Sequence, residues 1–195
     1  GLRARPRETA AFDAPQIGTF LHFLLENVTR DVLAEGGFAA VEQEELHRLV
    51  RRYTERYVEQ ELHNFQNRNA RFRYLFARLR TTAYAVIDQV AAELRCSDFV
   101  PMAFELSFGG KNGALSAVTI SEPDGELRVG GKVDRVDGWL HDGRLYLRVV
   151  DYKSGRKSFD LANVRMGLDI QMLLYLFTLQ KEGAHYFGQE IEPAG

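Results

Sequence analysis

The segment that decides the fold is GGKVDRVDGWLHDGRLYLRVVDYK, residues 130–153. Two apolar stretches flank Asp142 and Gly143, and an Asp-Gly dipeptide in that setting is typical of a two-residue β-hairpin turn. Pairing the residues next to the turn and counting back along both strands places Asp134 opposite Asp151. Directly opposed side chains share a face of the sheet, with Cβ atoms about 4.5–5.5 Å apart. The sequence therefore predicts two facing carboxylates.

Lys153 falls on the same face, because side chains alternate along a strand. Two facing carboxylates repel each other, so a divalent cation between them is one explanation of the pattern. Carboxylate oxygens are hard ligands that suit Mg²⁺ or Mn²⁺. The other explanation is two solvated aspartates on an exposed sheet face, with Lys153 as an ion-pair partner. Spacing alone leaves both explanations open.

Composition limits the class of protein. The 195 residues include one cysteine, Cys96, which excludes an internal disulfide framework and fits a reducing compartment. The net charge of −2 argues against a uniformly basic nucleic-acid coat. No apolar run approaches the roughly 20 residues that span a bilayer. Because the chain opens without methionine and stops abruptly, we expect a domain excised from a longer protein.

The pattern of apolar residues predicts helices, then an antiparallel sheet, then a helix. Helical spacing begins at Ile17 and stops at the Gly36-Gly37 pair. Further helices are expected over about 41–64, 70–95 and 167–180, and strands over 102–108, 114–120, 126–140 and 145–153. The GGKNG stretch between the first two strands reads as a hairpin. We predict one α+β domain over 1–195, mainly helical over 1–96, with the sheet and closing helix over 100–195.

Two pairs of polar residues four positions apart lie on otherwise apolar helices. His22 and Glu26 flank the apolar stripe of the first helix, and residues at this spacing point the same way. A lone histidine near an apolar face is most often a hydrogen-bonded core residue. Gln171 and Tyr175 have the same spacing on the last helix, and taken singly they read as the polar edge of a buried helix.

The stretch RNARFRYLFARLR, residues 68–80, contains arginines and aromatics without one acidic residue. Such a composition suits single-stranded nucleic acid, through phosphate contacts and base stacking. Helical spacing, however, assigns Phe72 and Phe76 to the core and leaves the arginines as borders of that apolar face. No Walker A motif accompanies either GGK sequence, so an ATPase site is not expected in this chain.

Four ordered motifs, IGTFLHFLLE, GGKVDRVD, VVDYKSG and QMLLYL, resemble those of the RecB-like branch of the PD-(D/E)XK nucleases. The opening stretch LRARPRETAAFDAPQIGTFLHFLLE is similar to the C-terminal nuclease domains of the AddB family, the second subunits of bacterial AddAB helicase–nucleases. The resemblance runs from the first residues to about residue 180. It implies a restriction-endonuclease-like fold, a central mixed sheet flanked by helices.

The resemblance also implies roles for individual residues. The metal ligands would be His22, Asp134, Asp151 and the backbone carbonyl of Tyr152. Lys153 would be the catalytic lysine, acting with the two aspartates. The supporting or DNA-binding residues would be Gln171, Tyr175, Glu26 and Arg135, and Glu105 would lie near the metal ligands.

The function implied by the resemblance is Mg²⁺- or Mn²⁺-dependent hydrolysis of single-stranded DNA during processing of double-strand breaks. An exonuclease in the bacterial cytoplasm is implied, with an AddA-type subunit as partner and no membrane association. AddB proteins commonly hold an iron–sulfur cluster through four cysteines that flank the nuclease domain. Cys96 lies at neither flank, and one thiolate cannot hold a cluster. Either the flanking cysteines lie outside this sequence, or this branch of the family lacks them.

Two alternatives remain. The first is a standalone RecB-like or Cas4-like exonuclease, which has the same motifs. An adjoining helicase domain in the full-length protein would exclude this alternative. A DNA-end binding module with the nuclease fold and little catalysis belongs to a different class. An Asp134→Ala variant distinguishes this module from a nuclease, because in a nuclease catalysis should vanish while DNA binding persists.

Overall fold

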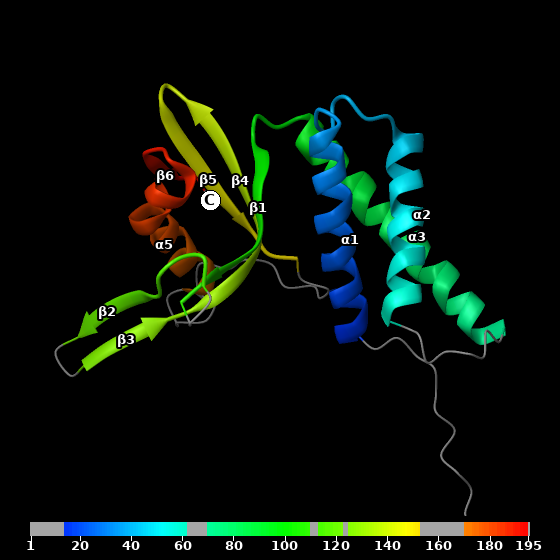
Figure 1. The fold of residues 1–195 in the computed structure, drawn as a ribbon, viewed down its shortest axis with the longest axis horizontal. Coiled ribbons are helices and arrows are strands. Elements are labelled where there is room, and N and C mark those ends of the chain that lie inside the picture. The colour runs from blue at the N-terminus through cyan, green and yellow to red at the C-terminus, as the bar shows by residue number, and fades with distance from the viewer. Residues whose placement is uncertain (1–13, 62–69, 110–112, 123–124, 153–169, 195) are drawn as a thin grey trace, which may run out of the picture. The chain divides into compact units, whose positions relative to one another are not determined.

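The computed structural model of the chain describes residues 14–61, 70–109, 113–122, 125–152 and 170–194. The chain divides into two compact units, residues 1–95 and residues 96–195 (Figure 1). The first is helical and the second holds the sheet, which follows the predicted change of character near residue 96. A single domain over 1–195 stays a prediction.

The described residues of the N-terminal unit, 14–61 and 70–95, hold the three helices that the apolar spacing predicts. They are α1 (Ala14–Ala34), α2 (Gln43–Glu61) and α3 (Ala70–Arg95). Helix α1 ends at the predicted glycine pair: Gly37 has a φ of +95° and its N–H donates to the carbonyl of Val32 at 2.8 Å. This left-handed cap satisfies a carbonyl that the ending helix leaves without an intrahelical partner.

The core of this unit is formed by the apolar stripes of the three helices. Their fully buried side chains include Phe20, Leu24, Leu25, Val28, Val32, Leu46, Leu49, Val50 and Ile87. At the end of α3, Arg95 donates from Nε to the carbonyl of Phe38 at 2.9 Å and from Nη2 to that of Val41 at 2.8 Å. The loop between α1 and α2 is thereby tied to the end of α3.

The second unit is built on a four-stranded mixed sheet in the order β1-β4-β5-β6. The strands are β1 (Val100–Phe108), β4 (Gly131–His141), β5 (Arg144–Val150) and β6 (Ile191–Pro193). Strands β1, β4 and β5 are antiparallel, and β6 adds to β5 in parallel. Helix α5 (Ile170–Phe187) packs on this sheet, and their shared buried core includes Val136, Leu147, Val149, Tyr175 and Leu179.

The predicted hairpin at Asp142 and Gly143 is confirmed. Both residues have positive φ, 49° and 77°, as a tight two-residue turn requires. His141 pairs with Arg144, and the register continues without a shift back to Arg135 opposite Val150. Strand β5 therefore ends at Val150, directly before Asp151, whereas the sequence predicts that it continues to residue 153.

The predicted hairpin of strands 102–108 and 114–120 is wrong. The partner of β1 is β4, and β2 (Val118–Glu122) pairs instead with β3 (Gly125–Val129) as a separate ribbon. The predicted strand 126–140 is accordingly two strands that break at Gly130. A Cβ on Gly130 would lie 3.0 Å from the carbonyl oxygen of Phe108, so a side chain there would require the backbone to shift by a few tenths of an ångström. None of the described helices is long and apolar enough to cross a membrane.

Candidate functional site

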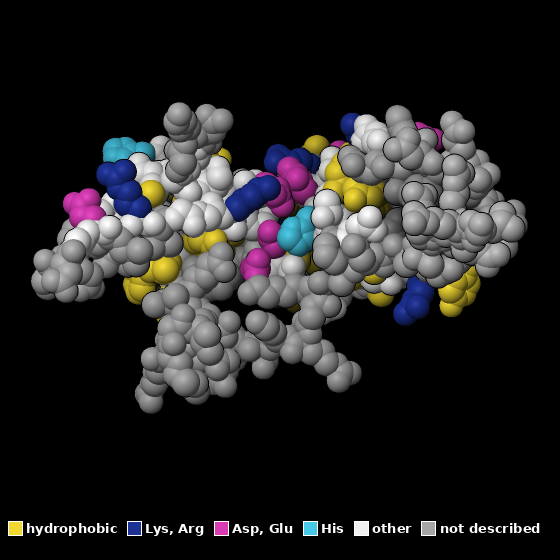
Figure 2. All heavy atoms as spheres, turned by 90° about the horizontal axis from the view of Figure 1, so that it is seen from below, with side chains coloured by type: hydrophobic (Ala, Val, Ile, Leu, Met, Phe, Trp, Pro, Cys, Tyr) yellow, Lys and Arg dark blue, Asp and Glu magenta, His cyan; other side chains and the backbone are white. Residues whose placement is uncertain are grey.

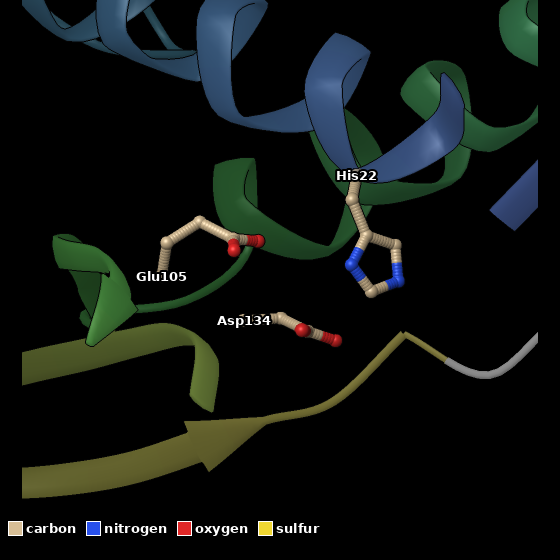
Figure 3. A group of neighbouring side chains, drawn as sticks. All are labelled: His22, Glu105 and Asp134. Atoms are coloured by element: carbon tan, nitrogen blue, oxygen red, sulfur yellow. The ribbon is translucent and has the colours of Figure 1, made fainter. Parts of the chain in front are cut away.

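Two acidic side chains face each other across β1 and β4. The register pairs Phe104 with Arg135 and Leu106 with Val133, so the residues between them, Glu105 and Asp134, are opposite each other. A carboxylate oxygen of Glu105 lies within 4.8 Å of one of Asp134, and Figure 3 shows both side chains extending from their neighbouring strands. Like charges directly opposed in a sheet destabilise it unless positive charge lies nearby. Two hard oxygen donors at this spacing fit Mg²⁺ or Mn²⁺.

The backbone of Glu105 is strained. Its φ is +53°, a left-handed conformation that a residue with a Cβ adopts only at a cost. The side chain of Lys132 forms an ion pair with the Glu105 carboxylate. Strained residues gather at functional sites, where the surrounding structure holds them in place. The strain at Glu105 is therefore a second sign, independent of the facing charges, that this part of the sheet has a chemical role.

Asp134 is also bonded to the chain that follows β5. Its Oδ2 accepts a hydrogen bond from the backbone N–H of Tyr152 at 2.6 Å. The register of β4 and β5, extended by one pair, would put Asp134 opposite Asp151. The carboxylate of Asp151, however, is not part of a close group with Glu105 and Asp134 in the described part of the chain. Glu105 lies on the β1 side of Asp134, whereas Asp151 follows β5 on the other side of β4. The metal-ligand role of Asp151 stays a prediction.

Comparison with known proteins identifies the family. A profile described as the PD-(D/E)XK nuclease superfamily matches residues 1–195. The chain belongs to the PD-(D/E)XK nuclease superfamily. The predicted fold class, an α+β protein with a mixed sheet and N-terminal helices, is confirmed by the superfamily and by the sheet order.

Similar curated proteins are bacterial helicase–nuclease subunits, each named as the B-type subunit of an ATP-dependent helicase/deoxyribonuclease. The whole chain aligns at 32% identity with the protein from Exiguobacterium sibiricum and at 31% with that from Oceanobacillus iheyensis. The protein of the same name from Clostridium tetani is 27% identical. The chain spans 17% of the length of each of these relatives. The resemblance to the AddB family is confirmed by these matches.

The predicted motif on α1, IGTFLHFLLE, lies in the N-terminal unit. His22, which Figure 3 labels, is partly buried. Glu26, one turn further along, accepts hydrogen bonds at Oε1 from Arg30 Nε at 3.1 Å and Nη2 at 2.9 Å. The Glu26 carboxylate is therefore engaged within its own helix, and its supporting role stays a prediction, as does the metal-ligand role of His22.

The motif on α5 is described in part. Tyr175 is 4% exposed and its ring stacks on Phe108, with the centroids 5.0 Å apart and the planes inclined by 14°. A ring so placed supports β1 and β4 from within the core, because it packs directly on the sheet. Gln171 lies in the first turn of α5, but its side chain is outside the described residues, as is the whole of Lys153.

Arg135 is buried, with 1% of its surface exposed, and its guanidinium binds Asp137 and the hydroxyl of Tyr152. Burial raises the pKa of the Tyr152 phenol to about 12, against an opposing effect of the Arg135 charge. The phenol is therefore protonated at neutral pH. Asp137 is not among the residues predicted from the sequence, although the predicted register already placed Arg148 directly opposite it.

Acidic and basic side chains occur together on the face of the molecule that Figure 2 shows. This mixture agrees with the small net charge of −2.

Proposed function

We propose that this chain is the divalent-metal-dependent deoxyribonuclease domain of a longer bacterial helicase–nuclease subunit. Its substrate is single-stranded DNA, which it cleaves as an exonuclease during the processing of double-strand breaks in the cytoplasm. The observation that carries the proposal is the pair of facing carboxylates, Glu105 and Asp134, on a sheet of the PD-(D/E)XK superfamily. An AddA-type protein is the proposed partner, since each relative is named as one subunit of a larger enzyme.

The chemistry of the ligand set supports a metal of the Mg²⁺ or Mn²⁺ kind. Asp134 and Glu105 offer carboxylate oxygens, and we propose that His22, Asp151 and the carbonyl of Tyr152 complete the set. A bound divalent ion would supply charge neutralisation at the phosphate and a water of lowered pKa. An iron–sulfur cluster is not proposed for this chain, because its single thiol, Cys96, cannot hold one.

The remaining roles belong to the side chains. Lys153 orients the attacking water and stabilises the negative charge that develops on the phosphate. Gln171 and Tyr175 form the pair that steadies the DNA and the region of Lys153, and Arg135 acts through Tyr152. Asp134 is central in this scheme because it faces Glu105 and binds the N–H of Tyr152.

The test is cleavage of end-labelled single-stranded DNA with Mg²⁺ or Mn²⁺, comparing the wild-type chain with Asp134→Ala and Lys153→Ala. Each variant is expected to lose roughly 100- to 1000-fold in rate, the usual effect of removing one group that stabilises transition-state charge. The matched controls are Glu190→Ala and Lys181→Ala, exposed residues of the same unit, which should cleave like the wild type.

Calorimetry with Mn²⁺ decides the case in which the isolated chain does not cleave. Binding that is lost in Asp134→Ala would support a competent site that needs its partner protein. Cleavage that persists in Asp134→Ala, or a wild-type chain that neither cleaves nor binds Mn²⁺, would refute the proposal. A chain that binds Mn²⁺ and single-stranded DNA can still show no cleavage, even with its partner protein. That result would favour a DNA-end binding module.

A further inference from the structure

A cluster of buried charges lies beside the candidate site, on β4 and β5. Asp137 is fully buried and accepts hydrogen bonds from Arg135 Nε to Oδ1 at 2.7 Å and from Arg135 Nη2 to Oδ2 at 2.8 Å. Arg148, which is directly opposite Asp137 in the ladder, donates from Nε to Oδ2 at 2.9 Å. One carboxylate thus receives three charge-assisted bonds from two guanidinium groups.

This cluster reaches the candidate site through Tyr152. The third nitrogen of Arg135, Nη1, donates to the Tyr152 hydroxyl at 2.7 Å. The backbone N–H of the same tyrosine donates to Oδ2 of Asp134 at 2.6 Å. Hydrogen bonds at both ends of Tyr152, its hydroxyl and its backbone N–H, therefore link Arg135 and Asp137 to Asp134.

The planarity of the guanidinium gives this path a direction. Two nitrogens of Arg135 are bound to the two oxygens of Asp137, and such a forked pair fixes the plane of the group. Once the plane is fixed, Nη1 can point only one way, and it points at the Tyr152 hydroxyl. A lysine at 135 would keep the charge but lose this orientation, because an ammonium group binds as a point charge.

Tyr152 needs such an anchor because it lies beyond the regular sheet. The ladder of β4 and β5 ends at Arg135 opposite Val150, so the backbone of residues 151 and 152 is not held by strand pairing. Burying Arg135 with Asp137, beside the partly buried Arg148, is also a costly way to stabilise a sheet, since apolar residues of similar size are often as good or better. The arrangement is better explained by its effect on orientation, because it fixes the position of the Tyr152 side chain.

We propose that Asp137 and Arg135 are positioning residues that hold Tyr152, and with it the backbone after β5, against Asp134. The proposal rests on the proposed nuclease function for its consequence: with Tyr152 in place, Asp134 and the Tyr152 carbonyl keep the orientation in which they bind a divalent ion. Neither Asp137 nor Arg148 touches the substrate in this scheme.

The decisive variant is Tyr152→Phe, which removes one hydroxyl and leaves the ring. Hydrogen exchange of the metal-free chain is the first measurement. The amide of residue 152 should exchange at least about tenfold faster in the variant, because opening of its bond to Asp134 becomes easier. Calorimetry with Mn²⁺ is the second, and we expect about a tenfold rise in Kd, the usual effect of losing a residue that orients a metal ligand.

Tyr146→Phe is the matched control, because Tyr146 is a partly buried tyrosine of β5 that lies outside the cluster. It should change neither quantity. Arg135→Lys is the second variant and should behave like Tyr152→Phe, while the double variant should be no worse than Arg135→Lys alone. In cleavage of single-stranded DNA, kcat should fall with KM nearly unchanged, since Asp137 and Arg135 act on the metal ligands and not on the substrate.

The outcomes separate this proposal from the proposed function. If Asp134→Ala abolishes Mn²⁺ binding while Tyr152→Phe and Arg135→Lys match the wild type in exchange and in Kd, the metal site stands and the positioning role is wrong. If faster exchange at residue 152 leaves the Kd for Mn²⁺ unchanged, the cluster is only structural and the proposal fails. If the wild type and Asp134→Ala are equally unable to bind Mn²⁺, the proposed function fails and this proposal with it.

Discussion

The contact between Gly131 and Tyr175 gives a sharp prediction about the candidate site's support. A Cβ added at Gly131 would lie 2.8 Å from both Cε1 and Cζ of Tyr175, and closer still to its hydroxyl oxygen. Real Cβ atoms do not approach ring atoms so closely, so either the tyrosine or β4 must move. The ring cannot move freely, because it is 4% exposed and stacked on Phe108.

Gly131→Ala should therefore destabilise the second unit. Overpacking a well-packed core costs about 1–3 kcal/mol. The residue does not have a positive φ, so alanine adds no backbone strain and should regain about 0.4–1 kcal/mol through the unfolded state. We expect a net loss of roughly 1–2 kcal/mol in the free energy of unfolding, or a few degrees in Tm for a chain of this size.

Urea unfolding followed by the fluorescence of Trp139 measures this change. Trp139 is the single tryptophan and lies on β4, so its signal reports the second unit. Gly18→Ala on α1 is the control, since a Cβ there meets nothing within 4 Å. By circular dichroism it should be neutral or stabilising, because alanine favours a helix by about 1 kcal/mol over glycine.

A double-mutant cycle tests the cause. Tyr175→Phe removes the atom closest to the new methyl group, so the Gly131→Ala/Tyr175→Phe variant should be more stable than the sum of the single changes predicts, by at least about 0.5 kcal/mol. Strictly additive effects, or a Gly131→Ala variant as stable as the wild type, would refute the assignment of Tyr175 as the support of β4.

Three further predictions concern packing and protonation. Leu179→Ala, in the core between α5 and the sheet, should cost about 2–5 kcal/mol in urea unfolding, whereas the exposed Phe177→Ala should stay within about 0.5 kcal/mol; equal effects would contradict the orientation of α5. Arg95→Ala should lower the free energy of unfolding of the N-terminal unit by about 1–3 kcal/mol, measured by circular dichroism, since two loop carbonyls lose a charged donor. An unchanged free energy would show that these two hydrogen bonds do not stabilise the unit. Because the pKa of Tyr152 is raised to about 12, the stabilising effect of its protonated hydroxyl is complete below pH 10 and is lost as pH rises toward 12. The difference in unfolding free energy between wild type and Tyr152→Phe should therefore shrink over that range by roughly 1.4 kcal/mol per pH unit. A difference that stays constant with pH would contradict the raised pKa.

Local patterns in the sequence determined the helices and the central hairpin. Helical spacing of apolar residues and the Gly36-Gly37 stop predict α1 to α3 because both depend on residues a few positions apart. The Asp142-Gly143 turn fixes the register of β4 and β5 for the same reason, since a two-residue turn allows one pairing only. Two of the motifs behind the superfamily resemblance, IGTFLHFLLE and most of GGKVDRVD, lie within these elements.

Tertiary structure alone decided which strand lies beside β4. The sequence paired 102–108 with 114–120 because adjacent alternating segments favour a hairpin, but β1 pairs with β4 instead, across more than 20 intervening residues. That pairing puts Glu105 opposite Asp134, so the neighbour of Asp134 on β1 could not be found from local spacing. The burial of Asp137 between two arginines is likewise invisible in a strand whose alternation marks it only as polar. Contacts between distant segments depend on which surfaces pack together, and no local pattern encodes that choice.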